Sequence, residues 1–281
     1  MMTIGEKIRN LRNGKKMSQA ELADSLGVSR QAVTKWETDG GTPEIESLVA
    51  IAGTFGTSVD ALVKDYMPCF SSIIQYDIEM KKDFEIDLIP SNKVMIEGHN
   101  SEKVRVEMLS NTITTLDSDL KVYVDDKKHN MGIEMKRRND LTDTDCRNDL
   151  FIRIRLPREL IGGIELKTET KELHLRDFMT EDVEIGGKAD EITLKGVHGQ
   201  AEMDIGNDCV FTAYDLDGSL EINQIGKSSI VKVPNDLRFK AVNDGRKCEL
   251  SVSDRLSPDD GCEDFIELNG MKSRLTIEPL E

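Results

Sequence analysis

The residues best suited to chemistry are four polar side chains close together near the N-terminus. On a helical wheel at about 100° per residue they fall within one arc, and they are Arg30, Gln31, Thr34 and Lys35. The other side of the wheel carries the apolar residues Ala32, Val33 and Trp36. This pattern predicts a helix with a polar face that is rich in hydrogen-bond donors and free to enter a groove.

The rest of the chain offers little chemistry. Four histidines lack H-x-x-x-H or H-E-x-x-H spacing, so we expect them to be solvated or packed: His99, His129, His174 and His198. Asp215-Leu216-Asp217-Gly218 lacks the other ligands of a calcium loop, and Lys136-Arg137-Arg138 is expected to form a solvated turn. No G-x-S-x-G, phosphate-binding loop or dinucleotide fingerprint occurs. We therefore expect no enzymatic activity, no cofactor and no metal.

Five short helices are expected to position the polar face. The first, residues 4–12, is basic and amphipathic, the second starts at a capping box and runs to Leu26, and the third spans Arg30 to Glu37. The fourth is expected to bury Ile45, Leu48, Val49, Ala52 and Phe55. The predicted caps and stops are Gly14, Ser18, Gly27, Ser29, Thr42 with Pro43 following it, and Ser58.

The second and third helices have the features of a helix-turn-helix crossing. Ala23 is small where the helices approach, and Gly27 suits the positive φ of a tight turn. The runs from Gln19 to Ala23 and from Gly27 to Glu37 resemble the Cro/C1-type (XRE) DNA-binding domain, and the resemblance covers about residues 4–63.

This resemblance implies a sequence-specific DNA-binding transcriptional regulator. It implies that Gln19, with the helix N-terminus, contacts a DNA phosphate and that Ser29 caps the recognition helix and touches the backbone. It assigns base reading to Arg30, Gln31, Thr34 and Lys35, since Arg and Lys suit guanine and Gln suits adenine. Trp36 is expected in the core, and Glu37 is expected to pair with Arg9 or Arg12. A plain packing hairpin and a domain recruited to bind protein stay open as alternatives.

Charge is divided unevenly along the chain. Of the net −16, residues 1–65 carry eight basic against nine acidic residues, and residues 66–281 carry 29 against 44. The second part would repel nucleic acid and anionic membranes, so only the N-terminal segment is expected to face DNA. A homodimer would double the basic charge, and we expect it to bind an inverted repeat in double-stranded DNA.

The acidic part, residues 66–281, is predicted to form mainly strands after a linker. Residues 66–91 are predicted to be a linker, after which apolar and polar residues alternate at 93–96, 103–106, 120–124 and 150–156. Apolar columns then recur at about 19 residues, and two of them are Leu173, Ile192, Phe211, Ile230 and Leu166, Ile185, Met203, Ile222. A third column is Ile164, Val183, Ala201 and Leu220. In-register stacking of such repeats would give a β-solenoid.

Ile154-Arg155-Leu156-Pro157 and the glycine-punctuated repeats that follow are similar to the adhesin-like, toast-rack β-solenoid family, over about residues 92–278. The expected fold class is thus α + β multidomain: a five-helix domain at 1–65, a linker at 66–91 and an all-β, solenoid-like domain at 92–281. An antiparallel sandwich or meander is the alternative for the last part.

We expect a reduced, cytoplasmic protein without membrane insertion. The five cysteines are scattered, no run of apolar residues could span a bilayer, and Glu6, Lys7 and Arg9 interrupt any signal-like stretch. The main hypothesis is a dimeric regulator whose β domain self-associates or receives a signal or protein partner. The alternative is a non-catalytic interaction scaffold whose solenoid is the binding surface, and a third reading, a solenoid enzyme, would need clustered carboxylates on one face.

Overall fold

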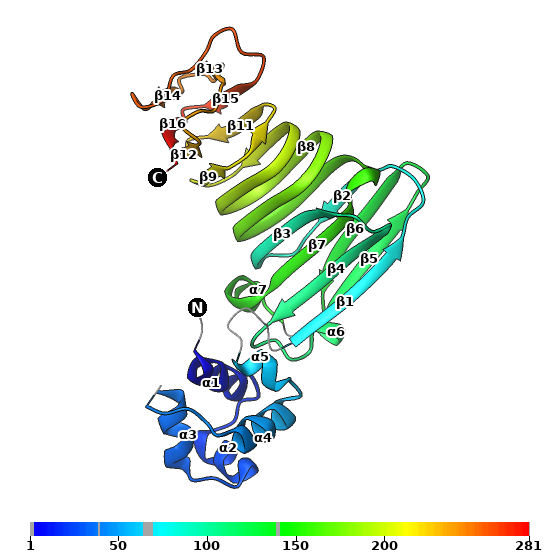
Figure 1. Cartoon of the computed structure of the whole chain (residues 1–281), viewed down its shortest axis with the longest axis vertical. Coiled ribbons are helices and arrows are strands. Elements are labelled where there is room, and N and C mark those ends of the chain that lie inside the picture. Colours follow the sequence, from blue (N-terminus) through cyan, green and yellow to red (C-terminus); the bar gives the residue numbers. More distant parts are fainter. Residues whose placement is uncertain (1–2, 39, 64–69, 139–140, 281) are drawn as a thin grey trace. The chain divides into compact units, whose positions relative to one another are not determined.

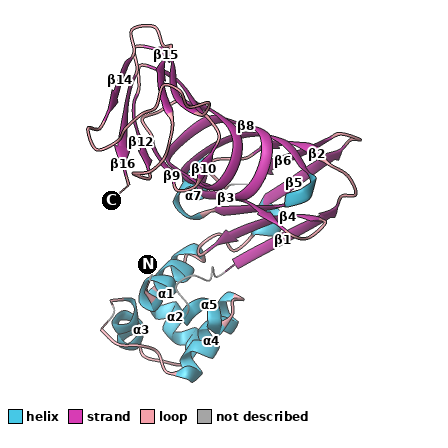
Figure 2. Cartoon of the chain, turned by 45° about the horizontal axis from the view of Figure 1, so that its top comes forward, coloured by secondary structure: helices cyan, strands magenta, loops and turns pink. Residues whose placement is uncertain are grey.

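A computed structural model of the chain describes residues 3–38, 40–63, 70–138 and 141–280. It divides into two compact units, one formed by Met1–Ser72 with Met108–Ser118 and the other by Ile73–Glu107 with Asp119–Glu281. We call α1 to α5 the helical domain and the strands of the second unit the β domain. In Figure 2 the helices, cyan, include α1 to α5, and the strands are magenta.

The helical domain contains the five expected helices (Figure 1): α1 Ile4–Gly14, α2 Gln19–Leu26, α3 Arg30–Glu37, α4 Ile45–Phe55 and α5 Val59–Val63. Ser18, Ser29 and Ser58 each accept a hydrogen bond from an amide in the following helical turn, as predicted. Gly27 takes the left-handed conformation at φ 67° that ends α2.

Two expectations for α4 were wrong. The helix begins at Ile45 with the extended Glu44 at the N-cap and no side-chain cap, since Thr42 and the buried Pro43 lie before the helix. Ile45 and Val49 are 73% and 56% exposed, so they do not belong to the buried stripe. The side chains that form the core are Ile8, Leu11, Leu22, Ala23, Val33, Trp36, Leu48, Ile51, Ala52, Phe55 and Leu62, which confirms the place predicted for Trp36.

The β domain is a single wound sheet. Its strands are β1 Phe70–Asp77, β2 Lys82–Asp87, β3 Ser91–His99, β4 Lys103–Ser110, β5 Leu120–Asp126, β6 Asn130–Arg137, β7 Phe151–Pro157, β8 Ile161–Ile205, β9 Val210–Ala213, β10 Leu216–Asp217, β11 Leu220–Ile225, β12 Ser228–Val233, β13 Lys240–Asn243, β14 Glu249–Val252, β15 Phe265–Met271 and β16 Arg274–Pro279. The short helices α6 Leu116–Asp119, α7 Asp143–Asp149 and η1 Arg158–Leu160 connect them. Figure 1 shows the 45-residue β8 winding through successive coils.

Parallel registers identify the coil as a β-solenoid and contradict the antiparallel sandwich. Ala201 pairs with Leu220 and Met203 with Ile222, both at a separation of 19 residues, as the predicted columns require. The fourth member of the first column was wrong by one residue, since Phe211 pairs with the buried Val231. Because neighbours in a strand face opposite sides, that single residue turns Ile230 outward.

The spatial order of the coils differs from their order in sequence. At the C-terminal end β15 lies between β11 and β13, and β16 lies between β12 and β14. At the other end β2 pairs with both β6 and β8, while β3 pairs with both β7 and β8. The separation between paired residues therefore changes from 19 for Met203 and Ile222 to 46 for Ile222 and Leu268.

The segment predicted to be a linker contains β1 and β2 instead. Phe84 and Ile86 of β2 alternate with acidic residues and are buried. Their partners in β6 and β8 are distant in sequence, which explains why two apolar residues among charges gave no recognised strand. The turn predicted at Lys136-Arg137-Arg138 was also wrong, because Lys136 and Arg137 lie in β6.

Candidate nucleic-acid interface

The candidate recognition surface lies on α3, and local capping fixes where that helix starts. Ser29 has extended backbone angles, and its hydroxyl accepts a hydrogen bond of 3.1 Å from the Ala32 amide. At the start of α2, Ser18 and Glu21 form a reciprocal capping box, with bonds of 2.7 and 3.2 Å. The two caps therefore fix where α2 and α3 begin, through residues within one helical turn.

The face of α3 opposite the core carries the four predicted polar residues. Arg30, Gln31, Thr34 and Lys35 are all exposed, whereas Val33, Trp36 and Glu37 are buried. The helical wheel therefore sorted this helix correctly. The two residues expected at the DNA backbone differ, since Ser29 is exposed and Gln19 is half-buried.

Glu37 is the centre of a polar network that joins three helices. Arg12 Nε donates to Glu37 Oε1 at 2.6 Å, and Arg12 Nη2 donates to Oε2 at 2.9 Å. Gln19 Nε2 also donates to Oε2, at 2.9 Å, and Arg9 donates to the Glu37 carbonyl oxygen. Both predicted partners thus reach Glu37, with Arg12 forming the ion pair.

The electrostatics of Glu37 follow from this geometry. Burial alone would raise its pKa, but the hydrogen bonds from Arg12 and Gln19 outweigh burial and hold the pKa below its usual value. The hydrogen bond to Glu37 raises the pKa of Arg12 in turn. The carboxylate is consequently ionised and can only accept hydrogen bonds.

The same network brings together two residues of the predicted site. Thr34 Oγ1 lies 3.0 Å from Gln19 Oε1 and 3.0 Å from the Arg30 carbonyl oxygen. The N-terminus of α2 is thus tied to the middle of α3. Sequence reasoning missed this link, because Gln19 and Thr34 are 15 residues apart.

Comparison with known proteins agrees with this geometry. The helix-turn-helix family model matches residues 8–62. The chain is similar to the immunity repressor protein of Bacillus phage phi105, with 30% identity over 115 residues that cover 38% of this chain and 80% of the repressor. The chain belongs to the helix-turn-helix family.

Two further proteins are similar to parts of the chain. The HTH-type transcriptional activator BcrR of Enterococcus faecalis is 44% identical over 62 residues, which cover 22% of this chain and 30% of the activator. A solved structure of a candidate adhesin from Bacteroides fragilis covers 75% of this chain and 97% of its own, with 11% identity and a TM-score of 0.41. The chain therefore spans under a third of the length of BcrR.

The basic residues of the helix-turn-helix domain are not all on its surface. Lys7 is 1% exposed and donates to the Ala61 carbonyl oxygen, which joins α1 to α5. Lys15 lies 5.7 Å from the centroid of the Phe55 ring and donates to the Thr54 carbonyl oxygen at 3.0 Å. Part of the positive charge counted in the sequence therefore stabilises this domain.

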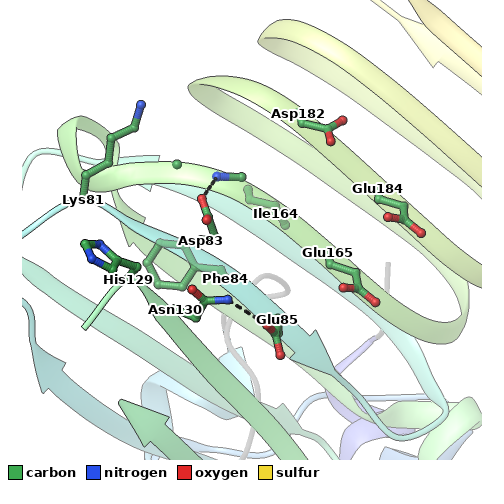
Figure 3. Close-up of a pocket in the computed structure, with 12 residues that line it drawn as sticks. Lys81, Asp83, Phe84, Glu85, His129, Asn130, Ile164, Glu165, Asp182 and Glu184 are labelled. Atoms are coloured by element: carbon green, nitrogen blue, oxygen red, sulfur yellow. Dashed lines mark hydrogen bonds between the residues drawn. The ribbon is translucent and has the colours of Figure 1, made fainter. Parts of the chain in front are cut away.

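The β domain has a groove of about 590 Å³ that the sequence did not indicate (Figure 3). Carboxylates dominate its lining, together with Lys81 and His129: Asp83, Glu85, Glu165, Asp182 and Glu184. Asp83 accepts from the Gly163 amide at 2.8 Å, and Asn130 donates to Glu85 at 3.0 Å. Burial first, and the surrounding carboxylates second, raise the pKa of Glu184.

This groove is one end of a column of glutamates that we call the glutamate ladder: Glu85, Glu165, Glu184, Glu202, Glu221 and Glu267, in which Glu184 interacts with both Glu165 and Glu202. The registers pair Glu85 with Glu165, Glu202 with Glu221, and Glu221 with Glu267. Burial and then Glu267 and Glu202 raise the pKa of Glu221. Negative charge is therefore concentrated along one face of the β domain.

Histidines of the β domain lie beside neighbouring oxygen atoms. Three histidines contact a neighbouring oxygen, namely His99 with the Lys103 carbonyl at 2.8 Å, His174 with Glu172 at 3.2 Å and His198 with Asp217 at 3.0 Å. Within residues 3–280, gaps aside, no group of three or more His, Cys, Asp or Glu is arranged to hold a metal ion. The helices that the structure describes are all too short or too polar to cross a membrane.

The four cysteines that the structure describes are free thiols, and Cys69 lies outside the described residues. Burial raises the pKa of Cys146 to about 11 and that of Cys209 to about 12. Both thiols therefore stay protonated and unreactive near neutral pH.

Proposed function

We propose that the chain is a sequence-specific DNA-binding transcriptional regulator whose α3 enters the major groove. The observation that carries the proposal is the exposed polar face of α3, on which four donor-bearing side chains lie opposite the buried Val33 and Trp36. In this proposal Arg30 and Lys35 read guanine, Gln31 reads adenine and Thr34 contributes to base reading. Gln19 and Ser29 contact the DNA backbone at the starts of α2 and α3.

Charge supports the helix-turn-helix domain, residues 1–65, as the part that meets DNA. Residues 66–281 carry 44 acidic against 29 basic residues, and the glutamate ladder would repel phosphates. A homodimer would place two recognition helices on one duplex and favour an inverted repeat with half-sites about 34 Å apart. We propose that the protein is cytoplasmic, where such a DNA target is accessible.

For the β domain we propose self-association or the sensing of a signal or partner. The groove between β2 and β8 and the glutamate ladder support the second role, because their carboxylates lie on the surface of the β domain, where Asp83, Asp182 and Glu184 are exposed. A partner that recognises the ladder would be cationic.

The test is selection of random duplex DNA by the full-length protein at about 50 and 200 mM salt, since phosphate contacts make affinity salt-dependent. We expect an enriched inverted repeat. Replacing Arg30 and Gln31 by Ala should weaken binding to it by about 10²-fold or more, because each good base contact contributes about 1 to 3 kcal/mol. Arg255→Ala, at an exposed arginine of the β domain, is the matched control and should leave binding unchanged. Unchanged binding by the double variant would overturn the assignment of α3.

A further inference from the structure

The hydroxyl and the methyl group of Thr34 have different surroundings. The hydroxyl lies 3.0 Å from two acceptors, Gln19 Oε1 and the Arg30 carbonyl oxygen, and its single proton satisfies one of them at a time. The hydroxyl proton is therefore used within the protein, whereas the methyl group cannot form hydrogen bonds. Since Thr34 is exposed on the polar face of α3, its methyl group is accessible to a base.

Glu37 determines which end of the Gln19 amide faces Thr34. A carboxylate accepts hydrogen bonds and cannot donate them, so the contact of 2.9 Å with Glu37 requires the Nε2 end of Gln19. The Oε1 end is thereby directed at the Thr34 hydroxyl. Arg12 holds Glu37 from the other side through two further bonds.

A fixed hydroxyl also fixes the methyl. Threonine is branched at Cβ, so the position of Oγ1 determines that of Cγ2 through the same χ1 torsion. A methyl group presented in the major groove matches one base in particular, because thymine carries the only methyl group displayed there. The chemistry of the bridge thus favours thymine opposite Thr34.

We propose that Thr34 recognises the 5-methyl group of a thymine in each half-site, and that Gln19 strengthens this preference by holding the Thr34 hydroxyl together with the Arg30 carbonyl. The inference rests on the proposed DNA-binding function and deepens it, since it names one base and the group on it. Gln19 is a positioning residue in this role, in addition to the backbone contact proposed above.

The experiment replaces single thymines of the selected operator by deoxyuridine, which removes only the 5-methyl group. The full-length protein should lose about fourfold in affinity at one thymine per half-site, the effect of one buried methyl-sized group. The other thymines should show no loss.

Thr34→Ser keeps the hydroxyl and removes the methyl, so the variant should bind the thymine and deoxyuridine duplexes equally. Thr38→Ser is the matched control, because it makes the same change just beyond α3, where Thr38 bonds the Thr34 carbonyl, and it should keep the fourfold ratio. Gln19→Met removes the acceptor at similar size and should reduce the ratio to about twofold. Its lost phosphate contact weakens both duplexes equally and leaves the ratio unaffected.

The outcomes separate this inference from the proposed function. An enriched operator that tolerates deoxyuridine everywhere, or a ratio that survives Thr34→Ser, would overturn this inference as a whole and leave the proposed function standing. A ratio lost in Thr34→Ser and intact in Gln19→Met would overturn the role of Gln19. Failure to enrich any operator would overturn the proposed function and this inference together.

Discussion

The helical domain and the β domain place their functional groups through contacts of very different sequence separation. In the helical domain, Ser29 caps α3 from three residues away, and the longest link in the Glu37 network spans 28 residues. In the β domain, Asp83 bonds the Gly163 amide across 80 residues, and Glu221 pairs with Glu267. The first site is largely encoded locally, whereas the second exists only once distant strands have paired.

The Glu37 network and the glutamate ladder place their carboxylates in opposite electrostatic surroundings. Glu37 is 1% exposed and is compensated by Arg12 and Gln19, so its pKa is lowered. Glu184 and Glu221 lie beside other carboxylates, and their pKa values are raised. The ionised Glu37 therefore stabilises the helical domain at neutral pH, whereas repulsion within the glutamate ladder destabilises the β domain.

The largest expected effect is at a backbone contact between coils. Gly218 has φ +137°, and a Cβ at this position would lie 2.1 Å from the Gly199 carbonyl oxygen. Gly218→Ala should destabilise the β domain by about 4 kcal/mol or prevent its folding, because strained backbone and steric overlap combine. Urea denaturation of the full chain, followed by circular dichroism, measures the change.

Gly186→Ala is the control for this variant, since a Cβ there would meet only the Lys167 side chain at 4.0 Å. It should change the free energy of unfolding by less than about 1 kcal/mol. Equal behaviour of the two variants would mean that close stacking of coils does not limit this domain.

The next effect concerns the single compensated carboxylate of the helical domain. Glu37→Ala leaves Arg12, which is 12% exposed, without its acid partner, and should destabilise the helical domain by about 3 kcal/mol. A double-mutant cycle with Arg12→Ala measures the coupling between the two side chains. A coupling energy near zero would show that the network is not needed for stability.

A smaller effect tests how locally the helix ends are encoded. Ser29→Ala should cost about 1 kcal/mol through loss of the bond to the Ala32 amide. Glu44→Ser should stabilise by up to about 1 kcal/mol, because Glu44 has extended angles at the N-cap of α4 and provides no side-chain bond. Thermal unfolding of both variants checks the sign, and a loss in the second would show that this helix start depends on contacts beyond its cap.

The smallest expected effect is a gain in stability on removing charge from the glutamate ladder. Replacing both Glu184 and Glu221 by Gln should stabilise the β domain by about 0.5 kcal/mol at pH 7, since like charges on adjacent strands repel. Their folded-state pKa values lie above the ordinary 4.5, so the wild type gains stability as pH falls through the folded pKa, and the advantage of the variant disappears below pH 4.5.

Glu37→Gln tests the opposite dependence of stability on pH, in the helical domain. The folded-state pKa of Glu37 lies below the ordinary 4.5, so its contribution is present above pH 4.5 and is lost as pH falls through the folded value. Urea midpoints measured from pH 7 to pH 3.5 should therefore diverge in the two domains. Parallel slopes would contradict the difference between the two carboxylate environments.

Much of the helical domain could be predicted because its signals are short. Ser18, Gly27 and Ser29 determine helix ends through bonds to residues at most four positions away, and the wheel of α3 separates exposed from buried residues. The cap of α4 could not be predicted in this way, because the burial of Pro43 depends on the packed domain.

For the β domain, the sequence predicted the repeating strands but not the order in which those strands pair. The alternation and the 19-residue columns indicated parallel coils, and Ala201 with Leu220 confirms one of them. One extra residue between Phe211 and Val231 changed the register there. Strand β2 was missed because its two apolar residues are recognisable only beside β6 and β8.

The sequence by itself determined the helix-turn-helix module, its polar recognition face and the repeating strands, since each depends on residues within one turn or one repeat. Only the tertiary structure decided that β15 enters between β11 and β13, that carboxylates stack into a ladder, and that Glu37 directs Gln19 toward Thr34. These features depend on which distant segments bury one another and pair their backbones, a choice that no local pattern contains.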